Sequence, residues 1–398
     1  MAFSVPWQGT EWTMGGVWRL AMAGLTGTLL GVGLGRFAYT PLLPVLIGEG
    51  WVDAGGGALL GAANLTGYLL GAVTAARTGR LLGPVPVLRG AMLLVTLSLL
   101  ACAWNGGLAW LGAWRFLAGV AGAMLMILAA PVLMAQVPVD KKPLVAGIVF
   151  SGIGAGVMVS GTLLPWLAGF GAASAWAGIG VLALLLTGLV WTQWPPAPRP
   201  PTAVVAGMRR SWPLWLFTLA YATDGMGFVP HTLFLADYVA RGLGLGIAMG
   251  GAYWFVFGVG AVTGPLLAAR MAGKLGFAPA LTLALGVKAA AVGLPLLSSA
   301  PLPLGLSAFL VGALTPGCVA LASGVAGQLA GPAGHTAAWG RMTAIYALFQ
   351  AAGGYGLTLL FTRTGSHLPL FAAGAAILVL GTLAGLAGLS LVKKEALP

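Results

Sequence analysis

Charged residues are scarce in this chain of 398 residues and make up only 7% of it. Soluble domains carry about 25% charged residues. The apolar share is 59%, so the chain cannot build an ordinary water-facing surface. Apolar stretches of about 18 residues or more, enough to cross about 30 Å of hydrocarbon, recur along the whole sequence. The composition therefore predicts a helical protein that crosses a membrane many times.

The sequence is also short of acidic residues and cysteines, which excludes several functions. The seven acidic residues are too scattered for a two-acid catalytic site, and the patterns H-E-x-x-H and Gly-x-x-x-x-Gly-Lys are both missing. Cys102 and Cys318 lie singly in apolar stretches and make no metal or redox pattern. Met226 and His231 are five residues apart and lie on different faces of a helix. We expect no enzyme, no ATP-driven pump, no cofactor and no bound metal.

The basic residues outnumber the acidic ones, and the net charge is +12. A nucleic-acid partner would need them clustered on one solvated face. Instead they fall in every second gap between the apolar stretches, at Arg77, Arg80, Arg89, Lys141, Lys142, Arg199, Arg209, Arg210, Arg270, Lys274, Lys393 and Lys394. The other gaps hold Glu49, Asp53, Asp237, Arg241 and Arg363. This asymmetry follows the positive-inside rule, so we expect no nucleic acid and both termini in the cytoplasm. The membrane is expected to be a bacterial inner membrane.

Glycines, prolines and charged residues divide the apolar sequence into twelve predicted spans. The first six cover 17–47, 56–76, 84–104, 107–135, 144–168 and 174–194. The second six cover 212–238, 247–270, 277–298, 302–328, 336–362 and 367–391. Between the sets, five prolines within eight residues favour extended polyproline geometry over a helix. We predict an N-terminal six-helix bundle at 1–194, a cytoplasmic proline-rich linker at 195–210 and a C-terminal six-helix bundle at 211–398.

Residues of the first two spans recur in the seventh and eighth spans, in the same order. In the first span and 192 residues later, the matching sets are Gly33, Gly35, Thr40, Leu43 and Gly225, Gly227, Thr232, Leu235. For the second and eighth spans they are Gly61, Gly71, Arg77, Gly79, Arg80 and Gly250, Gly260, Arg270, Gly273, Lys274. Two halves of the same fold, with a site between them at mid-depth, are typical of major facilitator transporters. We therefore predict an all-α membrane protein with twelve transmembrane helices in two pseudo-symmetric bundles.

Over nearly its whole length the chain resembles the major facilitator superfamily. The segment Arg77-Thr-Gly79-Arg80 is similar to the family's cytoplasmic loop motif, although Ala76 stands where the motif has an aspartate. The segment Arg115-Phe-Leu-Ala-Gly119 is similar to the arginine motif, whose arginine is associated with proton coupling in drug antiporters. The fifth span resembles the antiporter glycine motif without its Gly-Pro pair, at Gly147, Gly152, Gly154, Gly156 and Gly161.

Two further segments resemble the YbfB/YjiJ-type branch of the superfamily, which is usually described as sugar or drug efflux permeases. They are Gly33-Leu-Gly-Arg36-Phe-Ala-Tyr39-Thr-Pro41-Leu-Leu-Pro44 and Asn64-Leu-Thr-Gly67-Tyr68-Leu-Leu-Gly71. The resemblance implies alternating access about a cavity between the halves and outward, antiport-type movement of a small molecule.

The stretch 214–238 carries an acidic residue, Asp224, about half-way along a predicted span. An ionisable group at this depth costs about 2.5 to 3.5 kcal/mol on insertion scales, and such groups are usually functional. His231 is seven residues on, which returns it to the same face of a regular helix, and Tyr221 extends the stripe. We expect this helix to carry the proton coupling. The alternative is a carboxylate that pairs with an arginine and joins two helices.

Two arginines lie inside other spans. Arg36 shares a face with Tyr39 and Thr40 and could bind an anionic group of the substrate, pair with Asp224, or extend to the membrane interface. Arg115 is followed by glycines and alanines that let another helix pack close to it. We expect it to face the cavity and assist proton coupling, and the alternative is a hydrogen bond to a carbonyl of a neighbouring helix.

Aromatic and polar side chains at helical spacing give a second set of candidates, which either bind substrate or form close-packed surfaces. We expect substrate contacts from Arg36, Tyr39, Asn64, Tyr68, Arg115, Tyr221, Tyr253, Trp254, Tyr346 and Gln350. Gating or loop roles are expected for Arg77, Gly79, Arg80, Arg270, Lys274 and Arg341. Lys288 has no evident role and is expected to extend to the membrane interface, and His335 and His367 are expected at solvated or interfacial helix ends.

Three hypotheses follow. The first is a monomeric, proton-coupled secondary transporter that moves a small organic molecule outward across the inner membrane, with Asp224 taking and releasing the proton. The second is an importer or exchanger of an organic anion that Arg36 and Arg115 bind, with Asp224 balancing charge. The third is a membrane receptor or assembly factor that does not transport, which a cavity plugged with apolar side chains would favour.

Overall fold

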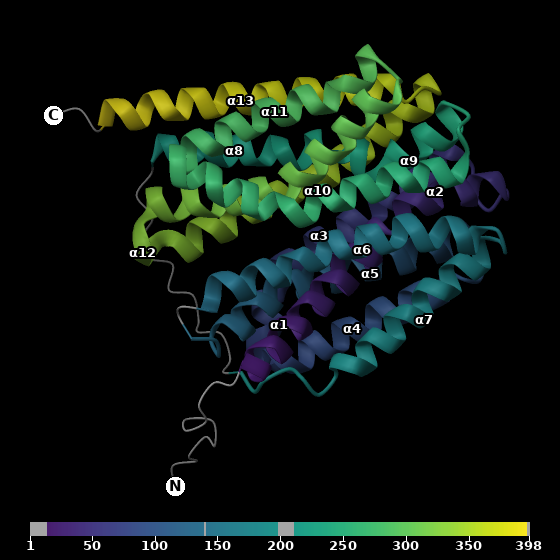
Figure 1. The fold of residues 1–398 in the computed structure, drawn as a ribbon, viewed down its shortest axis with the longest axis horizontal. Coiled ribbons are helices and arrows are strands. Elements are labelled where there is room, and N and C mark those ends of the chain that lie inside the picture. The colour runs from purple at the N-terminus through teal and green to yellow at the C-terminus, as the bar shows by residue number, and fades with distance from the viewer. Residues whose placement is uncertain (1–13, 139–140, 198–210, 396–398) are drawn as a thin grey trace, which may run out of the picture.

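The computed structural model describes residues 14–138, 141–197 and 211–395, and within these ranges the regular elements are all helices (Figure 1). Eleven helices are long and apolar enough to cross a membrane. The remaining crossing, 212–242, is broken into four shorter pieces. The predicted all-helical architecture with twelve crossings is confirmed. Of the predicted linker, residues 198–210 lie outside the described residues.

The helices alternate in direction along the chain. The first are α1 (Met14–Thr28), η1 (Leu29–Phe37), α2 (Tyr39–Gly48), α3 (Ala54–Leu82), α4 (Pro84–Ala101), α5 (Gly107–Met134), α6 (Lys142–Ala168) and α7 (Ala172–Val190). The others are α8 (Trp212–Gly227), η3 (Pro230–Phe234), α9 (Leu235–Asp237), η4 (Tyr238–Gly242), α10 (Gly246–Leu275), α11 (Phe277–Leu297), α12 (Pro301–Thr364) and α13 (Leu368–Glu395). The element α12 is two spans joined at Gly331, where φ is 69°.

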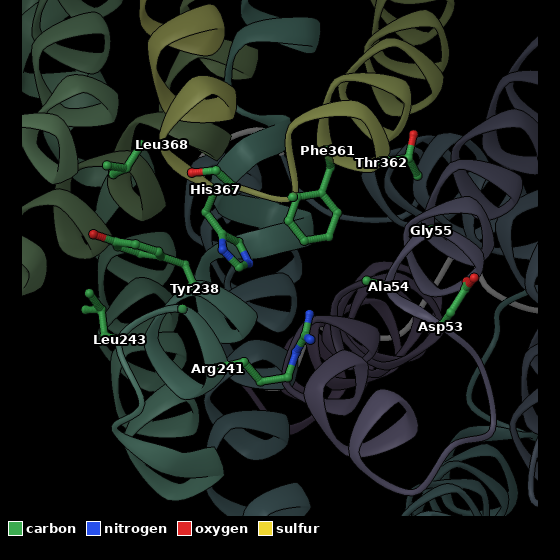
Figure 2. A pocket seen from close by; sticks show the side chains of 13 residues that line it. Asp53, Ala54, Gly55, Tyr238, Arg241, Leu243, Phe361, Thr362, His367 and Leu368 are labelled. Atoms are coloured by element: carbon green, nitrogen blue, oxygen red, sulfur yellow. The ribbon is translucent and has the colours of Figure 1, made fainter.

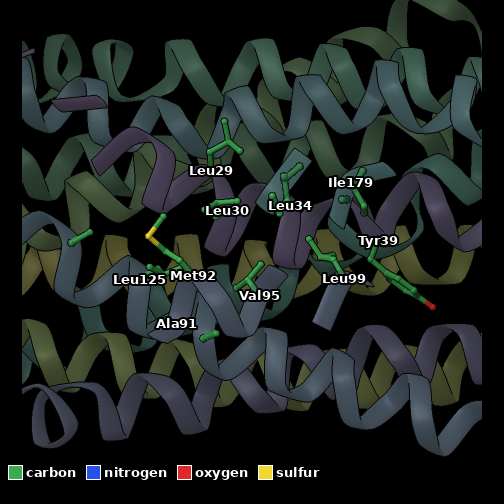
Figure 3. Packing of buried hydrophobic residues seen from close by; sticks show 14 of the residues in the cluster. Leu29, Leu30, Leu34, Tyr39, Ala91, Met92, Val95, Leu99, Leu125 and Ile179 are labelled. Atoms are coloured by element: carbon green, nitrogen blue, oxygen red, sulfur yellow. The ribbon is translucent and has the colours of Figure 1, made fainter. Parts of the chain in front are cut away.

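The end of the molecule where α1 begins and α13 finishes is called the near end, and the opposite end the far end (Figure 1). Helices α1–α7 and α8–α13 form two groups side by side, and each group surrounds most of one hydrophobic core cluster. In the first cluster Leu30 and Leu34 pack against Met92 and Val95 (Figure 3). We call these groups the first and second halves.

The first and seventh crossings contain wide helical turns, in η1, η3 and η4. They meet where Thr40 donates a hydrogen bond to the backbone carbonyl of Thr232, which is 192 residues away. These are the matching threonines of the internal repeat. Two positions related by a pseudo-two-fold axis can touch only where they lie close to that axis, so the axis passes between Thr40 and Thr232.

Glycines allow the helices of each half to pack at backbone distance. A Cβ at Gly264 of α10 would collide with the carbonyl of Ala313, and one at Gly67 of α3 would collide with that of Phe116. Between the halves, a Cβ at Gly161 would lie 2.8 Å from the carbonyl oxygen of Gly251. Small residues at such crossings are typical of membrane helices, where close packing replaces the hydrophobic effect as the main attraction.

The loops that were predicted after the second and eighth spans are not loops. The helix α3 continues through Gly79 to Leu82 and ends at Gly83, where φ is 89°, directly before Pro84. The residues expected in these loops lie inside helices, with Arg77, Gly79 and Arg80 in α3 and Arg270 and Lys274 in α10. Their basic side chains are tolerated because they fall on the last turns, at the near end of each helix.

We expect Gly264→Ala to destabilise the protein by about 1 to 3 kcal/mol, because the added methyl group overpacks the α10–α12 contact. Gly273→Ala on the same helix is the matched control, since an added Cβ there meets nothing within 4 Å. The control should be neutral or stabilising by up to about 1 kcal/mol. Unfolding of both purified variants in detergent measures the difference, and equal stabilities would contradict this account of the packing.

Candidate functional site

A fully buried ion pair lies at mid-depth in the second half. The Nζ atom of Lys288 on α11 lies 2.7 Å from Oδ1 of Asp224 on α8, and neither side chain is exposed. The expectation that Lys288 extends to the membrane interface is therefore wrong. The helix α11 packs against α8, α12 and α13, so the lysine side chain turns inward to the carboxylate.

The pairing also corrects the expected partner of Asp224. Neither Arg36, which the sequence had offered as a partner, nor Arg115 forms an ion pair with Asp224. The second oxygen of Asp224, Oδ2, is buried and has no hydrogen-bond partner in the described part of the chain. The carboxylate therefore faces the interior of the half, as intramembrane acids usually do, with a single cation beside it.

The helix α8 ends directly beyond this acid, and Phe228 occupies the break. The ring centroid of Phe228 lies 4.5 Å from Nζ of Lys288 and 6.0 Å from Cζ of Arg36. Both distances lie within the range in which a cation is attracted to an aromatic face. Phe228 therefore connects the ion pair of the second half to an arginine of the first half.

Arg36 lies where the two halves meet. Its Nη1 donates to Oε1 of Gln350 at 3.0 Å, and the two residues are 314 positions apart. The arginine is only 9% exposed, so the alternative that it extends to the membrane interface is wrong. Arg36 Nη2 and Gln350 Nε2 are buried donors that have no partner among the described residues. An unpaired buried donor costs about 1 to 3 kcal/mol, which makes these two atoms candidates for binding an acceptor group.

Arg115 supports the backbone of the first crossing. Its Nη1 donates to the carbonyl of Gly35 at 2.8 Å, and its Nη2 to that of Arg36 at 3.3 Å. Asn64 donates to the same Gly35 carbonyl at 3.2 Å. The wide turns of η1 disturb the regular helical bonds, and polar side chains of neighbouring helices satisfy the affected groups. Of the two roles expected for Arg115, the structure shows the hydrogen bond to carbonyls of a neighbouring helix.

A small cavity of about 20 Å³ lies between Arg36 and Arg115 on the boundary of the halves. It has room for about one water molecule. Leu233 of the second half closes one side, where it occupies the space above Gly61. No acidic side chain in the described ranges pairs with Arg36 or Arg115. The polar cluster therefore holds three cations and one carboxylate, and two positive charges lack a partner of opposite sign.

The aromatic candidates divide into two groups. Tyr221 and Tyr346 stack with their ring centroids 4.4 Å apart, and Phe228 lies 6.3 Å from Tyr346, so these rings belong to the cluster. Trp254 donates to Oγ of Ser160 across the boundary of the halves at 3.2 Å. The structure thus places both tyrosines near the ion pair and the tryptophan at the contact between α6 and α10.

Tyr253 does not join its neighbour Trp254 at that boundary. Its hydroxyl group donates to the carbonyl of Pro301 at the far end of α12, at 3.3 Å. The expectation of a substrate contact from Tyr253 is therefore not supported by its position, because consecutive residues of a helix face different neighbours.

Most of the expected residues lie in two places. The structure brings together Arg36, Tyr39, Asn64, Tyr68, Arg115, Tyr221, Asp224, Tyr346 and Gln350 at mid-depth. The near end holds Arg77, Gly79, Arg80, Arg270, Lys274 and Arg341. The guanidinium of Arg341 lies 5.3 Å from the ring centroid of Trp215, at the start of α8.

His231 lies on the same crossing as Asp224 but faces another partner. Its Nε2 is 2.7 Å from Oγ of Ser307, which in turn donates to the carbonyl of Ala291 at 2.6 Å. No described bond joins His231 to Asp224. The break at Phe228 and the wide turns that follow change the rotation per residue, so the seven-residue spacing no longer implies a shared face.

A larger pocket of about 670 Å³ lies at the far end, between the start of α3 and the connections around η4 and α13 (Figure 2). Beside it, buried Asp237 pairs with Arg241 of the same crossing and with Nε2 of His367 at 2.7 Å. His367 stands at a helix end as expected, directly before α13, but it is only 8% exposed, so the solvated one of the two expected positions is wrong. The sequence analysis did not predict this network. The four-residue spacing of Asp237 and Arg241 indicates it, because oppositely charged residues at that spacing can pair on one face of a helix.

The sequence was compared with profiles of known protein families. The profile of the family described as uncharacterised MFS-type transporter YbfB matches residues 28–386. The chain belongs to this family of the major facilitator superfamily. The protein is therefore a multi-pass membrane transporter of the secondary type and not an enzyme. No curated protein sequence matches the chain significantly.

Two solved structures share the fold. One is a bacterial homolog of the human lysosomal transporter Spinster, in an inward-facing and unoccupied conformation, with 14% identity and a TM-score of 0.68 over 97% of this chain and 99% of that chain. The other is a D-xylose-proton symporter, with 15% identity and a TM-score of 0.71 over 94% of this chain and 96% of that chain. At these identities the likeness shows the fold alone.

We expect Asp224→Asn and Lys288→Met each to destabilise the protein by about 3 to 5 kcal/mol, because either change leaves a buried charge without its partner. The double variant should cost much less than the sum, since it removes both charges together. A double-mutant cycle of unfolding free energies measures the coupling. Additive effects of the two substitutions would contradict the pairing.

Proposed function

We propose that this protein is a proton-coupled secondary transporter of a small organic molecule, in which Asp224 takes and releases the proton. The observation that carries the proposal is the ion pair of Asp224 with Lys288, in which neither side chain is exposed. A proton on the carboxylate removes the charge that holds the lysine in place. Because an unpaired buried charge is costly, protonation favours a different arrangement of the helices around it.

The geometry also supplies a route from the proton site to the boundary of the halves. Lys288 and Arg36 lie near the same ring, that of Phe228. Arg36 in turn bonds to Gln350 across the boundary. A lysine released from Asp224 therefore changes the electrostatic surroundings of the contact that joins the halves. His231 is a candidate second proton carrier, since its buried Nδ1 has no partner in the described ranges.

Alternating access would follow from rocking of the halves about this cluster. Several contacts between the halves lie at mid-depth or toward the far end, as in the pairs Gly154 with Gly258, Gly161 with Gly251 and Thr66 with Tyr355. We propose that these contacts open when the near end closes. The pocket of about 670 Å³ at the far end would then be the vestibule through which substrate leaves.

The orientation and direction are parts of the same proposal. We place the near end in the cytoplasm of a bacterial cell, because the described basic residues close to the ends of the crossings lie mostly there, at Arg77, Arg80, Arg89, Lys142, Arg270 and Lys274. Outward transport rests on the resemblance to efflux permeases. The monomer is proposed as the functional unit, since the cluster lies within one chain.

We expect Asp224→Asn to abolish transport driven by an imposed pH gradient, because the asparagine cannot exchange a proton. A ligand-stabilisation screen on the purified protein would first identify a substrate, and its flux into or out of liposomes would then be followed. Glu49→Gln is the matched control, since Glu49 lies outside the far-end pocket and accepts the backbone N–H of Ala172, a hydrogen bond that the glutamine oxygen can also accept. Unchanged proton-driven flux in the folded Asp224→Asn variant would reject the coupling role.

A second candidate function, transport of an organic anion, is favoured by the two arginines that lack an acidic partner. The free donors of Arg36 and Gln350 come from opposite halves, so a carboxylate bound by both would hold the halves together. Arg115, which lines the adjoining cavity, would add positive charge. In this function Asp224 balances charge and need not exchange a proton.

We expect Gln350→Glu to abolish the binding of an anionic substrate, because the new carboxylate would occupy Arg36 itself. Gln350→Leu is the control, since it removes the hydrogen bond to Arg36 without adding charge, and it should weaken binding by about tenfold or less. Arg36→Lys should also weaken binding, because the two-pronged guanidinium contact is lost. Affinities measured by ligand stabilisation test these expectations, and equal binding by the Gln350→Glu variant would exclude the anion site.

A further inference from the structure

A groove of about 440 Å³ lies between α10, α11 and α12, apart from the central cluster and from the far-end pocket. Its walls are mainly apolar, and they include Leu267, Leu275, Leu283, Val287, Leu310 and Leu314. Leu267 is 43% exposed and Leu283 is 49% exposed, so the groove opens on the outer surface of the second half. In a membrane this surface faces lipid chains.

Two basic residues, Arg270 and Lys274, are the charged members of the lining. They are four residues apart on the last turns of α10, which places them on one face at the near end. No described side chain forms an ion pair or hydrogen bond with either of them. The sequence has no acidic residue between Asp237 and Glu395, so this part of the chain supplies no internal counter-charge.

We propose that this groove binds an anionic phospholipid, with the phosphate group held by Arg270 and Lys274 and an acyl chain lying along the leucines. Basic pockets between membrane helices bind acidic headgroups, and the cytoplasmic leaflet supplies such lipids. A water-soluble phosphate compound would leave the apolar walls unused, and a neutral amphiphile would leave both cations unpaired. An anionic lipid matches the apolar and the basic parts together.

The groove adjoins the helix that holds the buried ion pair. Ala284, which lines the groove, lies one turn before Lys288 on α11. A bound lipid would therefore pack against α11 one turn from the lysine. The inference rests on the groove and its charges, and from the proposed function it takes only the placement of the near end in the cytoplasm.

The test uses the purified full-length protein in nanodiscs that contain either photoactivatable phosphatidylglycerol or photoactivatable phosphatidylcholine at equal mole fraction. After illumination, peptide mass spectrometry locates the labelled residues. We expect phosphatidylglycerol to label the groove about tenfold more than phosphatidylcholine, because two basic residues attract its headgroup. The double variant Arg270→Gln, Lys274→Gln should reduce this labelling to the level seen with phosphatidylcholine.

The matched control is the double variant Arg77→Gln, Arg80→Gln, which removes the same charge from the last turns of α3 at the same end of the molecule. These residues do not line the groove, so labelling of the groove should persist. A thermal-shift series with added phosphatidylglycerol gives an independent readout. It should stabilise the wild type and the control variant more than the Arg270→Gln, Lys274→Gln variant.

Three results would overturn the proposal. Equal labelling by the two lipids would show that the basic residues do not favour an anionic headgroup over a neutral one. Displacement of the label by millimolar inorganic phosphate would show a site for a free anion and not for a lipid. Cross-links from the groove to a second copy of the chain, in place of lipid, would show that the groove is an interface between copies.

Discussion

The second half of this transporter depends on the contact between Asp224 and Lys288. A charge at mid-depth in a membrane persists only beside a partner or in a wet cavity, and both of these side chains are fully buried. Each side chain therefore keeps its charge at this depth only because the other lies beside it. Within the described ranges Lys288 pairs with no other acidic residue, and Asp237 is engaged with Arg241 and His367 at the far end. The helices α8 and α11 must keep the register in which this pair forms, and the surrounding rings pack around it.

The polar residues of the first half have a different task. The first crossing is widened in η1, and the carbonyl of Gly35 receives hydrogen bonds from both Arg115 and Asn64. Residues that look like a binding site in the sequence are thus partly occupied with the backbone. Arg36 and Gln350 differ because they meet across the boundary of the halves, where each keeps a buried donor without a partner among the described residues; Nε of Arg115 is a third such donor. The geometry therefore favours Arg36 and Gln350 as substrate contacts over Asn64, whose amide group donates to the backbone.

Much of the architecture could be predicted because each crossing is encoded locally. The span predicted at 84–104 is α4 (Pro84–Ala101), and that predicted at 107–135 is α5 (Gly107–Met134). The prediction failed at the near ends of α3 and α10, where basic residues were taken to mark loops. A helix can carry arginine and lysine on its last turn, since their long side chains reach the membrane surface. Charge marks the depth in the membrane there, and the two helices end where the chain takes a positive φ, at Gly83 and Gly276.

The sequence predicted most residues of the candidate site, but it did not predict which of them would bond to each other. Asp224, Arg36 and Gln350 stand out in the sequence as polar residues inside apolar stretches, while the role of Lys288 was missed. Because α8 breaks at Phe228, His231 does not lie on the same face as Asp224, although the seven-residue spacing had predicted this. A regular helix was assumed there, and the wide turns follow from contacts with other helices that no local pattern reveals.

By itself the sequence determined that this chain spans a membrane twelve times and repeats its fold, because hydrocarbon imposes a length and an apolar composition on each crossing separately. Only the tertiary structure decided which charges meet. Arg36 and Gln350 are 314 residues apart, and the partner of a buried charge depends on how whole helices pack and rotate against one another. That information is shared among all the contacts of the fold and is absent from any single stretch.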